Sequence, residues 1–513
     1  MFKTMEKVDI IEKNEYKSRI DELEARLGGL QRKCRELKIP VLVLMDGLEV
    51  AGKGIQIGKL MKALDPRGFR VYSITEESEE EKAHPFLWRF WNKIPGNGEI
   101  VILDGSWYRK VTIDLFDEKI ISQNTLECYD EIRSFEQQLV DSGMCLVKFF
   151  LYIDEREQKI RMKKLEEDKS TSWRVTKDDW KKNKKFTAYK ALVNDVLTAT
   201  HSKIAPWKVV NAVDRRTATI HLYEYLIKAI EEQIKSVRME AIHKEHKEHK
   251  EYKETKQLVE QQLVIEQLAV EDENQNGKIL DTIDLDKVLS DEEYDIKLEK
   301  LQKKIQKLHG ELYRQKIPMV IGFEGWDAGG KGGAIRRLTE KMDSRGYVVF
   351  PIQAPSTIEK NHHYLWRFWK NMPKDGHITI FDRTWYGRVM VERIEGFCSE
   401  EEWKRAYKEI NDMEQSLYNA GAIVIKFWLQ IDKGEQKARF EARQADPEKQ
   451  WKITDEDWRN REKWDAYEMA VNEMIAKTST QHAPWVIVEG NDKKYARIKV
   501  LETVIQAMET RLK

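Results

Sequence analysis

A glycine-rich stretch ending in lysine is the part of this sequence best suited to chemistry. Residues 324–333 read EGWDAGGKGG, in which Gly325 is followed after four residues by Gly330 and Lys331. This is the spacing of a phosphate loop, in which backbone N–H groups face phosphate oxygens at a helix N-terminus and the lysine neutralises charge. Such a loop usually continues with a Ser or Thr that holds magnesium, but here Gly332 follows. A metal ion must therefore find other oxygen ligands.

Two aspartates are the candidate ligands for that metal ion. Asp327 lies inside the loop, and Asp382 ends the apolar run of residues 377–382. An apolar strand that stops at a carboxylate is typical of the second metal-binding motif of phosphate-loop enzymes, although a lone aspartate there could equally cap a helix. Magnesium beside phosphates needs few protein oxygens, because substrate and water supply the rest. The pair predicts a Mg²⁺ site, with Mn²⁺ as an alternative ion.

The order of elements around these residues predicts a parallel sheet. Residues 319–323 are a short apolar run before the loop, and residues 334–342 follow a helical pattern after it. Further strands and helices alternate downstream, which places helices on both faces of a parallel sheet. We therefore expect an α/β fold.

The whole arrangement occurs twice in the chain. Residues 15–235 reappear as residues 293–513 at a constant offset of 278 residues, without gaps. A repeat of this length is a whole domain, so we expect two related domains joined by a charged helical linker at residues 236–292. Duplicated domains inherit self-complementary surfaces, which predicts an intramolecular pseudo-twofold pair and leaves further oligomers open.

Composition argues against several kinds of partner. Lys plus Arg equals Asp plus Glu at 89 each, so a polyanion would be attracted by clustered charge and not by net charge. No nucleic-acid-binding module is recognisable, and we expect no nucleic-acid partner. No apolar stretch is long enough for a membrane span, so we expect a cytoplasmic protein without a membrane partner. The cysteines lack metal or disulfide spacing and are expected to be reduced thiols: Cys34, Cys128, Cys145 and Cys398.

Five motifs together carry a specific resemblance. They are EGWDAGGKGG at 324–333, LWRFW at 365–369, FDRTWYGR at 381–388, VER at 391–393 and APW at 483–485. In this combination both repeats resemble the type 2 polyphosphate kinase family, and the tandem arrangement resembles its two-domain class, the polyphosphate:AMP phosphotransferases. The resemblance implies two tandem P-loop kinase-like domains, each with a helical lid. It also implies inorganic polyphosphate as donor in place of ATP, and magnesium at Asp327 and Asp382.

The resemblance further implies that the lid is basic and covers the polyphosphate path. The matching segment is residues 434–443, in which Arg439 and Arg443 lie four apart and share one helical face. Two guanidinium groups aimed at one groove suit phosphate recognition, since their planar donors match phosphate geometry. The alternative is a charged surface helix stabilised by Glu435 and Glu441.

The remaining site residues follow the aspartate at the strand end. We expect Arg383 and Arg388 to reach phosphates and stabilise the charge of the transition state, and Glu392 to orient the nucleotide. The catalytic, metal-binding and nucleotide-binding residues are then Asp327, Lys331, Asp382, Arg383, Arg388 and Glu392. The phosphate-binding residues are Gly325, Gly329, Gly330, Lys331, Gly332, Gly333, Arg439 and Arg443.

Aromatic and histidine residues near these motifs are interpreted as structural. Residues 366–369 read WRFW, and residues 88–91 repeat them where the catalytic signals decay, so core packing is favoured over base stacking. His362 and His363 are expected at the rim, because transfer to a nucleotide phosphate needs alignment and charge neutralisation and not a general base. In the linker, three histidines spaced three apart drift around a helix by about 60° per step, which favours a solvated face over a metal site. They are His243, His246 and His249.

The first repeat keeps the loop spacing but loses much of its chemistry. Its loop reads DGLEVAGKGI at residues 46–55, with Glu49 in place of Asp327 and β-branched Ile55 in place of Gly333. Three further residues are replaced: Arg383 by Gly105, Glu392 by Asp114 and Arg443 by Leu165. We therefore expect the first domain to be catalytically silent, with a structural or regulatory role.

The predicted reaction is in-line transfer of the terminal phosphoryl group of polyphosphate to AMP, giving ADP reversibly. Two alternatives stay open. One is a different kinase of the same fold, either a polyphosphate-dependent nucleoside diphosphate kinase or an ATP-dependent nucleotide kinase, because the loop alone does not choose donor or acceptor. The other is a non-catalytic polyphosphate-binding scaffold.

Overall fold

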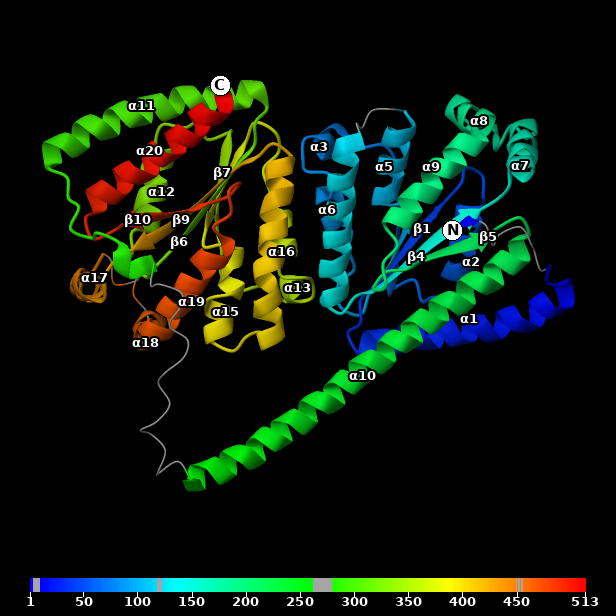
Figure 1. Cartoon of the computed structure of the whole chain (residues 1–513), viewed down its shortest axis with the longest axis horizontal. Helices are drawn as coiled ribbons and strands as arrows, with labels where there is room; N and C mark the ends of the chain where they lie inside the picture. Colours follow the sequence, from blue (N-terminus) through cyan, green and yellow to red (C-terminus); the bar gives the residue numbers. More distant parts are fainter. Residues whose placement is uncertain (3–9, 118–121, 262–278, 449, 451–452, 454) are drawn as a thin grey trace. The chain divides into compact units, whose positions relative to one another are not determined.

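The computed structural model of the protein describes residues 1–2, 10–117, 122–261, 279–448, 450, 453 and 455–513. The chain forms two compact units, one built mainly from the first repeat and the other mainly from the second. Each unit contains a five-stranded sheet flanked by helices (Figure 1). The predicted α/β class with tandem parallel sheets is confirmed.

In the first unit every strand pairing is parallel. The strand order is β2-β3-β1-β4-β5, so the strand that leads into the loop lies at the centre. The strands are β1 (Val41–Gly47), β2 (Phe69–Ser73), β3 (Ile100–Asp104), β4 (Cys145–Tyr152) and β5 (Trp207–Asn211). A connection from one parallel strand to the next needs a crossover, which helices supply here.

Two groups of helices flank the sheet of the first unit. Helices α1 (Lys13–Glu36), α2 (Lys53–Ala63) and α10 (Arg215–Gln261) pack together on one face. Helices α5 (Trp107–Phe116), α6 (Ser122–Asp141) and α9 (Phe186–Ala199) lie on the other face. The lid segment comprises α7 (Glu155–Glu167), η2 (Ser172–Arg174) and α8 (Lys177–Lys184). Two short helices of the first repeat are α3 (Glu79–Lys82) and α4 (Trp88–Trp91).

The second unit repeats this topology element for element. Its sheet order is β10-β9-β6-β8-β7, which is the same order read from the other edge, and its pairings are all parallel. The strands are β6 (Met319–Gly325), β7 (Tyr347–Pro351), β8 (Ile378–Asp382), β9 (Ile423–Gln430) and β10 (Trp485–Glu489). Sequence repetition therefore becomes repetition of the fold.

The helices of the second unit form the same two layers. One face carries α11 (Asp291–Gln315), α12 (Lys331–Thr339) and α20 (Lys493–Leu512). The short helix η3 (Ile279–Thr282) precedes α11 in the chain and contacts α19. The other face carries α16 (Glu400–Asn419) and α19 (Trp464–Thr478). The lid segment contains α17 (Lys433–Ala445) and α18 (Asp455–Glu462). The short elements are α13 (Thr357–Lys360), α14 (Trp366–Trp369), η4 (Trp385–Arg388) and α15 (Val391–Ile394).

The central strand β6 is buried because it has helices on both faces. Alternate residues Met319, Ile321 and Phe323 enter one apolar cluster with side chains of α11, α12 and α20. Parallel register pairs Phe323 with Asp382 on β8. The glycine-rich loop after β6 and the aspartate ending β8 are therefore neighbours at the carboxyl edge of the sheet, where ligands bind in open α/β folds.

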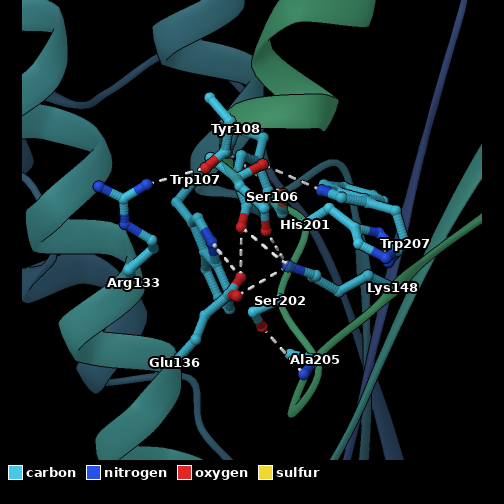
Figure 2. Close-up of polar contacts among 12 residues, drawn as sticks. Ser106, Trp107, Tyr108, Arg133, Glu136, Lys148, His201, Ser202, Ala205 and Trp207 are labelled. Atoms are coloured by element: carbon cyan, nitrogen blue, oxygen red, sulfur yellow. Dashed lines mark hydrogen bonds and ion pairs between the residues drawn. The ribbon is translucent and has the colours of Figure 1, made fainter. Parts of the chain in front are cut away.

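A buried ion pair lies on one face of each sheet, the face covered by α6 in the first unit and by α16 in the second. In the first unit Lys148 Nζ donates to Glu136 Oε2 at 2.7 Å, and Tyr108 Oη donates to Glu136 Oε1 at 2.6 Å (Figure 2). The second unit has the same arrangement, with 2.7 Å between Lys426 Nζ and Glu414 Oε2. Because both repeats have it, this network belongs to the fold and anchors the chain just after the strand-terminal aspartates.

The WRFW block at residues 366–369 packs in the core of the structure. Phe368 and Trp369 are buried, so the expected packing role of the WRFW block is confirmed. Helix α10 continues through residue 235 to Gln261, so the first part of the expected linker is helical. The side chains of the three linker histidines lie outside those that the structure describes.

All four cysteines are free thiols. Among the described residues, no helix combines the length and apolar character that a membrane span requires.

Candidate active site

The glycines of the second loop are required by its geometry. Gly325 has φ of 146°, and a Cβ atom there would lie 2.6 Å from the carbonyl oxygen of Leu429. Gly330 has φ of 109° and caps the N-terminus of α12. Gly329 has another constraint, because a Cβ atom would lie 2.8 Å from a carbonyl oxygen of the loop itself. Only glycine permits these conformations and approaches without strain.

The loop presents its lysine and an open helix start to a ligand. Lys331 Nζ donates to the carbonyl oxygen of Gly325 at 2.6 Å, so the side chain arches back over the loop. Nothing lies within 4 Å of a Cβ atom placed on Gly332, and on Gly333 the nearest atom is Arg497 Nη2 at 3.5 Å. The first turn of α12 is thus bare, with N–H groups that suit an anion.

Within the described part of the chain, two long contacts hold the loop carboxylate of Asp327. Its Oδ1 lies 3.3 Å from Arg383 Nη2, and its Oδ2 accepts from Asn460 Nδ2 at 3.3 Å. Such weak contacts leave lone pairs available, and Asp382 stands at the adjacent strand end. Within the described residues no three His, Cys, Asp or Glu side chains form a metal cluster. Two carboxylates fit Mg²⁺ beside phosphates, since phosphates and water complete its shell.

Arg383 has an unusual backbone for a residue with a side chain. Its φ is 68°, in the left-handed region, and its side chain is 53% exposed. The following residue fixes this turn, because Thr384 N and Oγ1 donate to the buried Glu324 carboxylate at 2.6 and 2.8 Å. Burial raises the pKa of Glu324, which Lys331 opposes. The turn therefore directs a guanidinium group toward the loop carboxylate.

Arg388 and Glu392 form a second, more buried pair. Arg388 Nη1 lies 3.1 Å from Glu392 Oε2, and its guanidinium carbon lies 4.5 Å from the ring centre of Tyr364. Burial raises the pKa of Glu392, and the charge of Arg388 opposes that shift. The structure thus pairs Arg388 with Glu392, two of the four residues that the sequence predicts to bind the nucleotide.

The structure gives the two lid arginines different positions. Arg439 is buried and donates to the carbonyl oxygens of Ala328, Gly490 and Asn491 at 2.8, 2.6 and 2.9 Å. Its guanidinium group braces the phosphate loop, so the expectation that it faces an open groove beside Arg443 needs correction. In the first unit Arg161 likewise donates to two carbonyl oxygens of the loop and to two after the last strand. A role shared by both repeats is structural.

Arg443, the other lid arginine, interacts electrostatically with the loop carboxylate. Burial lowers the pKa of its guanidinium group, while the charges of Asp457 and Asp327 oppose the shift. Burial likewise lowers the pKa of Lys493, and Arg439, Arg497 and Arg443 add to that effect. Positive charge thus gathers around the start of α12.

Sequence reasoning missed three residues at this site. Asn460 from α18 donates to the loop carboxylate, and Lys493 with Arg497 from α20 adds positive charge beside the loop. Their only sequence signal was a difference between repeats, since Lys182, Arg215 and Thr219 stand at the equivalent positions of the first repeat. That signal becomes interpretable only once the fold places α18 and α20 beside the loop.

The first unit lacks several of these features at the same places. Gly105, with φ of 79°, replaces Arg383, and Leu165 replaces Arg443. Ile55 puts an exposed apolar side chain on the first turn of α2, where the second repeat is bare. Lys53 Nζ still points back to the carbonyl oxygen of Gly47, at 3.5 Å. The first site keeps the loop but lacks the guanidinium groups of Arg383 and Arg443, and it has less room for phosphate.

Comparison with known proteins agrees with this division into two repeats. The model of the polyphosphate kinase 2 family matches residues 10–238 and again residues 288–513. The chain belongs to this family. Both matched ranges of this polyphosphate kinase 2 family model include a loop, a strand-terminal aspartate and a lid.

Individual relatives of the polyphosphate kinase 2 family resemble the chain to different extents. A Pseudomonas syringae pv. tomato protein named polyphosphate:AMP phosphotransferase is 38% identical, over 99% of this chain and 98% of its own length. A Pseudomonas aeruginosa protein named ADP-polyphosphate phosphotransferase is 37% identical, over 43% of this chain and 72% of its own. A crystal structure from Pseudomonas aeruginosa PA01, provisionally assigned as polyphosphate kinase 2, has a TM-score of 0.85 and 36% identity. It covers 100% of this chain and 99% of its own.

Proposed function

We propose that this protein transfers the terminal phosphoryl group of inorganic polyphosphate to AMP, giving ADP and a polyphosphate one unit shorter. The observation that carries the proposal is a complete phosphate loop in a two-repeat chain whose full-length relative is named polyphosphate:AMP phosphotransferase. The relative named for ADP as acceptor matches less than half of this chain, which favours AMP. The enzyme is a phosphotransferase of the kinase type.

Its own residues bind and align the phosphates. The N–H groups of the loop and the ammonium group of Lys331 hold phosphate oxygens at the start of α12. Arg383 and Arg388 stabilise negative charge that spreads over the transferred group, and Arg443 extends positive charge toward the lid. The phosphate of a nucleoside monophosphate has a second pKa of about 6 and is already an anion at neutral pH. The reaction therefore needs alignment of the two phosphates and no general base.

A divalent cation is part of this proposal. Asp327 and Asp382 would hold Mg²⁺, or Mn²⁺ in its place, and such an ion neutralises charge on the phosphates. Glu392, paired with Arg388, would help orient the nucleotide. The first repeat would contribute structure or regulation and not turnover.

The deciding experiment supplies the purified full-length chain with Mg²⁺ and AMP. One reaction contains long-chain polyphosphate and the other contains ATP, and a third offers ADP with polyphosphate. ADP formed from AMP with polyphosphate alone is the expected result. ADP formed only with ATP would reassign the protein to ordinary nucleotide kinases. ATP formed from ADP much faster than ADP from AMP would favour the nucleoside diphosphate kinase alternative.

A further inference from the structure

The two repeats differ in what faces the loop carboxylate from the lid. In the second unit, Asp327 receives a neutral amide from Asn460 on α18, at 3.3 Å. In the first unit the equivalent carboxylate is that of Glu49, and the residue equivalent to the asparagine is Lys182 on α8. An amide can yield its place to an incoming cation, whereas an ammonium group already supplies a positive charge.

Lys182 is held tightly against the carboxylate of the first loop. Its Nζ lies 2.7 Å from Glu49 Oε1, and the two side chains are only 11% and 16% exposed. Tyr189 Oη donates to the same oxygen at 3.3 Å, and Lys182 Nζ lies 5.4 Å from the Tyr189 ring centre. The extra methylene of Glu49, relative to aspartate, extends its carboxylate away from the backbone of the loop.

The surrounding helices keep this lysine in place. Helix α8 begins with a capping box between Thr176 and Asp179, which fixes its first turn. Asn183, next to the lysine, donates to Gln158 Oε1 at 2.9 Å, and Gln158 Nε2 donates to the carbonyl oxygen of Glu49 at 3.3 Å. The loop and the lid of the first unit are thus joined by a hydrogen-bonded chain as well as by the ion pair.

Low exposure makes this pair hard to displace. An ion pair with so little exposure is little screened by solvent, so breaking it leaves at least one charge poorly solvated. A divalent cation that approached Glu49 would meet the ammonium group at short range and would be repelled by it. The remaining candidate ligand, Asp104, would then be a single protein carboxylate for the ion.

We propose that the ammonium group of Lys182 takes the place beside the loop carboxylate that a divalent cation takes in the second repeat. The first repeat is therefore a metal-excluding version of the same site, closed by an internal cation. This inference rests on the proposed function for the metal role of Asp327, and it gives a physical cause for the silence of the first repeat. Replacing Lys182 with asparagine, the residue at the equivalent position of the second repeat, makes room for a divalent cation beside Glu49.

The test measures binding of Mn²⁺ to the full-length chain by electron paramagnetic resonance, without donor or acceptor. The second site is first disabled with Asp327→Asn and Asp382→Asn, and Lys182→Asn is then added. We expect the disabled chain to bind no Mn²⁺ at the first loop. The added Lys182→Asn is expected to create one Mn²⁺ site per chain that the disabled parent lacks.

A matched control and a second variant make the result decisive. Lys181→Asn removes the neighbouring lysine, which pairs with Asp117 at 3.0 Å on the exposed side of α8, and it should create no site. Lys182→Gln gives the same neutral amide on a longer side chain if Lys182→Asn does not fold. One Mn²⁺ in the disabled parent that Glu49→Gln abolishes would overturn the inference. So would the absence of a new site in folded Lys182 variants. Loss of Mn²⁺ on disabling the second site separately tests the metal role of Asp327.

Discussion

At the scale of single residues, Arg383 has a strained backbone conformation in the second repeat. An L-residue with a side chain at φ of 68° costs about 1–2 kcal/mol relative to the right-handed region. The first repeat has Gly105 at the equivalent position, with φ of 79°, where glycine adopts the conformation freely. At this position strain is therefore present only in the second repeat, which indicates that the guanidinium group itself is needed there.

We expect Arg383→Gly to separate stability from activity. The substitution removes backbone strain but adds chain entropy to the unfolded state, so the free energy of unfolding should change by about 1 kcal/mol or less. Turnover of AMP with polyphosphate should fall by about 10³-fold, since an arginine that stabilises phosphoryl-transfer charge contributes on that order or more. Chemical denaturation and steady-state kinetics measure the two quantities. Turnover close to that of the unaltered chain would show that Arg383 does not act on the transferred group.

At the scale of elements, each phosphate loop is braced by the first helix of its own lid. Arg439 on α17 and Arg161 on α7 donate to carbonyl oxygens of the loop and of the segment after the last strand. Most of these bonds are buried, so removing the donors costs about 1–3 kcal/mol for each buried carbonyl group left unpaired. The brace is shared by a complete and an incomplete site, which assigns it to positioning of the loop.

This shared brace predicts a paired outcome. Arg439→Lys and Arg161→Lys should each lower the free energy of unfolding of their own unit by about 2–4 kcal/mol, because lysine cannot reproduce the planar fork. Only Arg439→Lys should also reduce turnover, by about tenfold or more, through misplacement of the loop. Thermal unfolding and kinetics of both full-length variants give the comparison. An Arg439→Lys chain with normal stability but a raised KM for polyphosphate would instead make Arg439 a direct ligand.

At the scale of the whole molecule, the two repeats share a fold but differ in their sites. Both sheets have the same order and register, and both contain the buried Lys–Glu pair. The differences lie at the carboxyl edges: Arg383, Arg443 and Arg497 of the second repeat have Gly105, Leu165 and Thr219 as their equivalents. The two repeats therefore share their packing but differ in the side chains beside the phosphate loop.

The difference between repeats predicts which lysine matters for turnover. Lys331→Ala should reduce ADP formation by at least about 100-fold, because the loop loses its charge on the phosphates. Lys53→Ala, its equivalent in the first repeat, should leave ADP formation within about twofold of the unaltered chain. Each variant is compared at matched protein concentration after a check of folding by circular dichroism. A large loss with Lys53→Ala would contradict the silence of the first repeat.

The sequence by itself determined the repeat, the parallel α/β class, the phosphate loop and the strand-terminal aspartate. These features depend on local spacing and periodicity, so two glycines with four residues between them, or an apolar run before Asp382, can be recognised without the fold. The resemblance of the motifs added the family, which the comparison with known proteins confirmed.

Only the tertiary structure decided how distant residues share the site. It showed that Arg439 donates to a carbonyl oxygen of the loop and does not face an open groove. It also brought Asn460 into contact with Asp327, 133 residues away in the chain. It also set Lys182 on Glu49, across the same separation in the first repeat. Spacing along a helix shows which residues share a face but not what that face meets, because packing of lid and sheet fixes each partner.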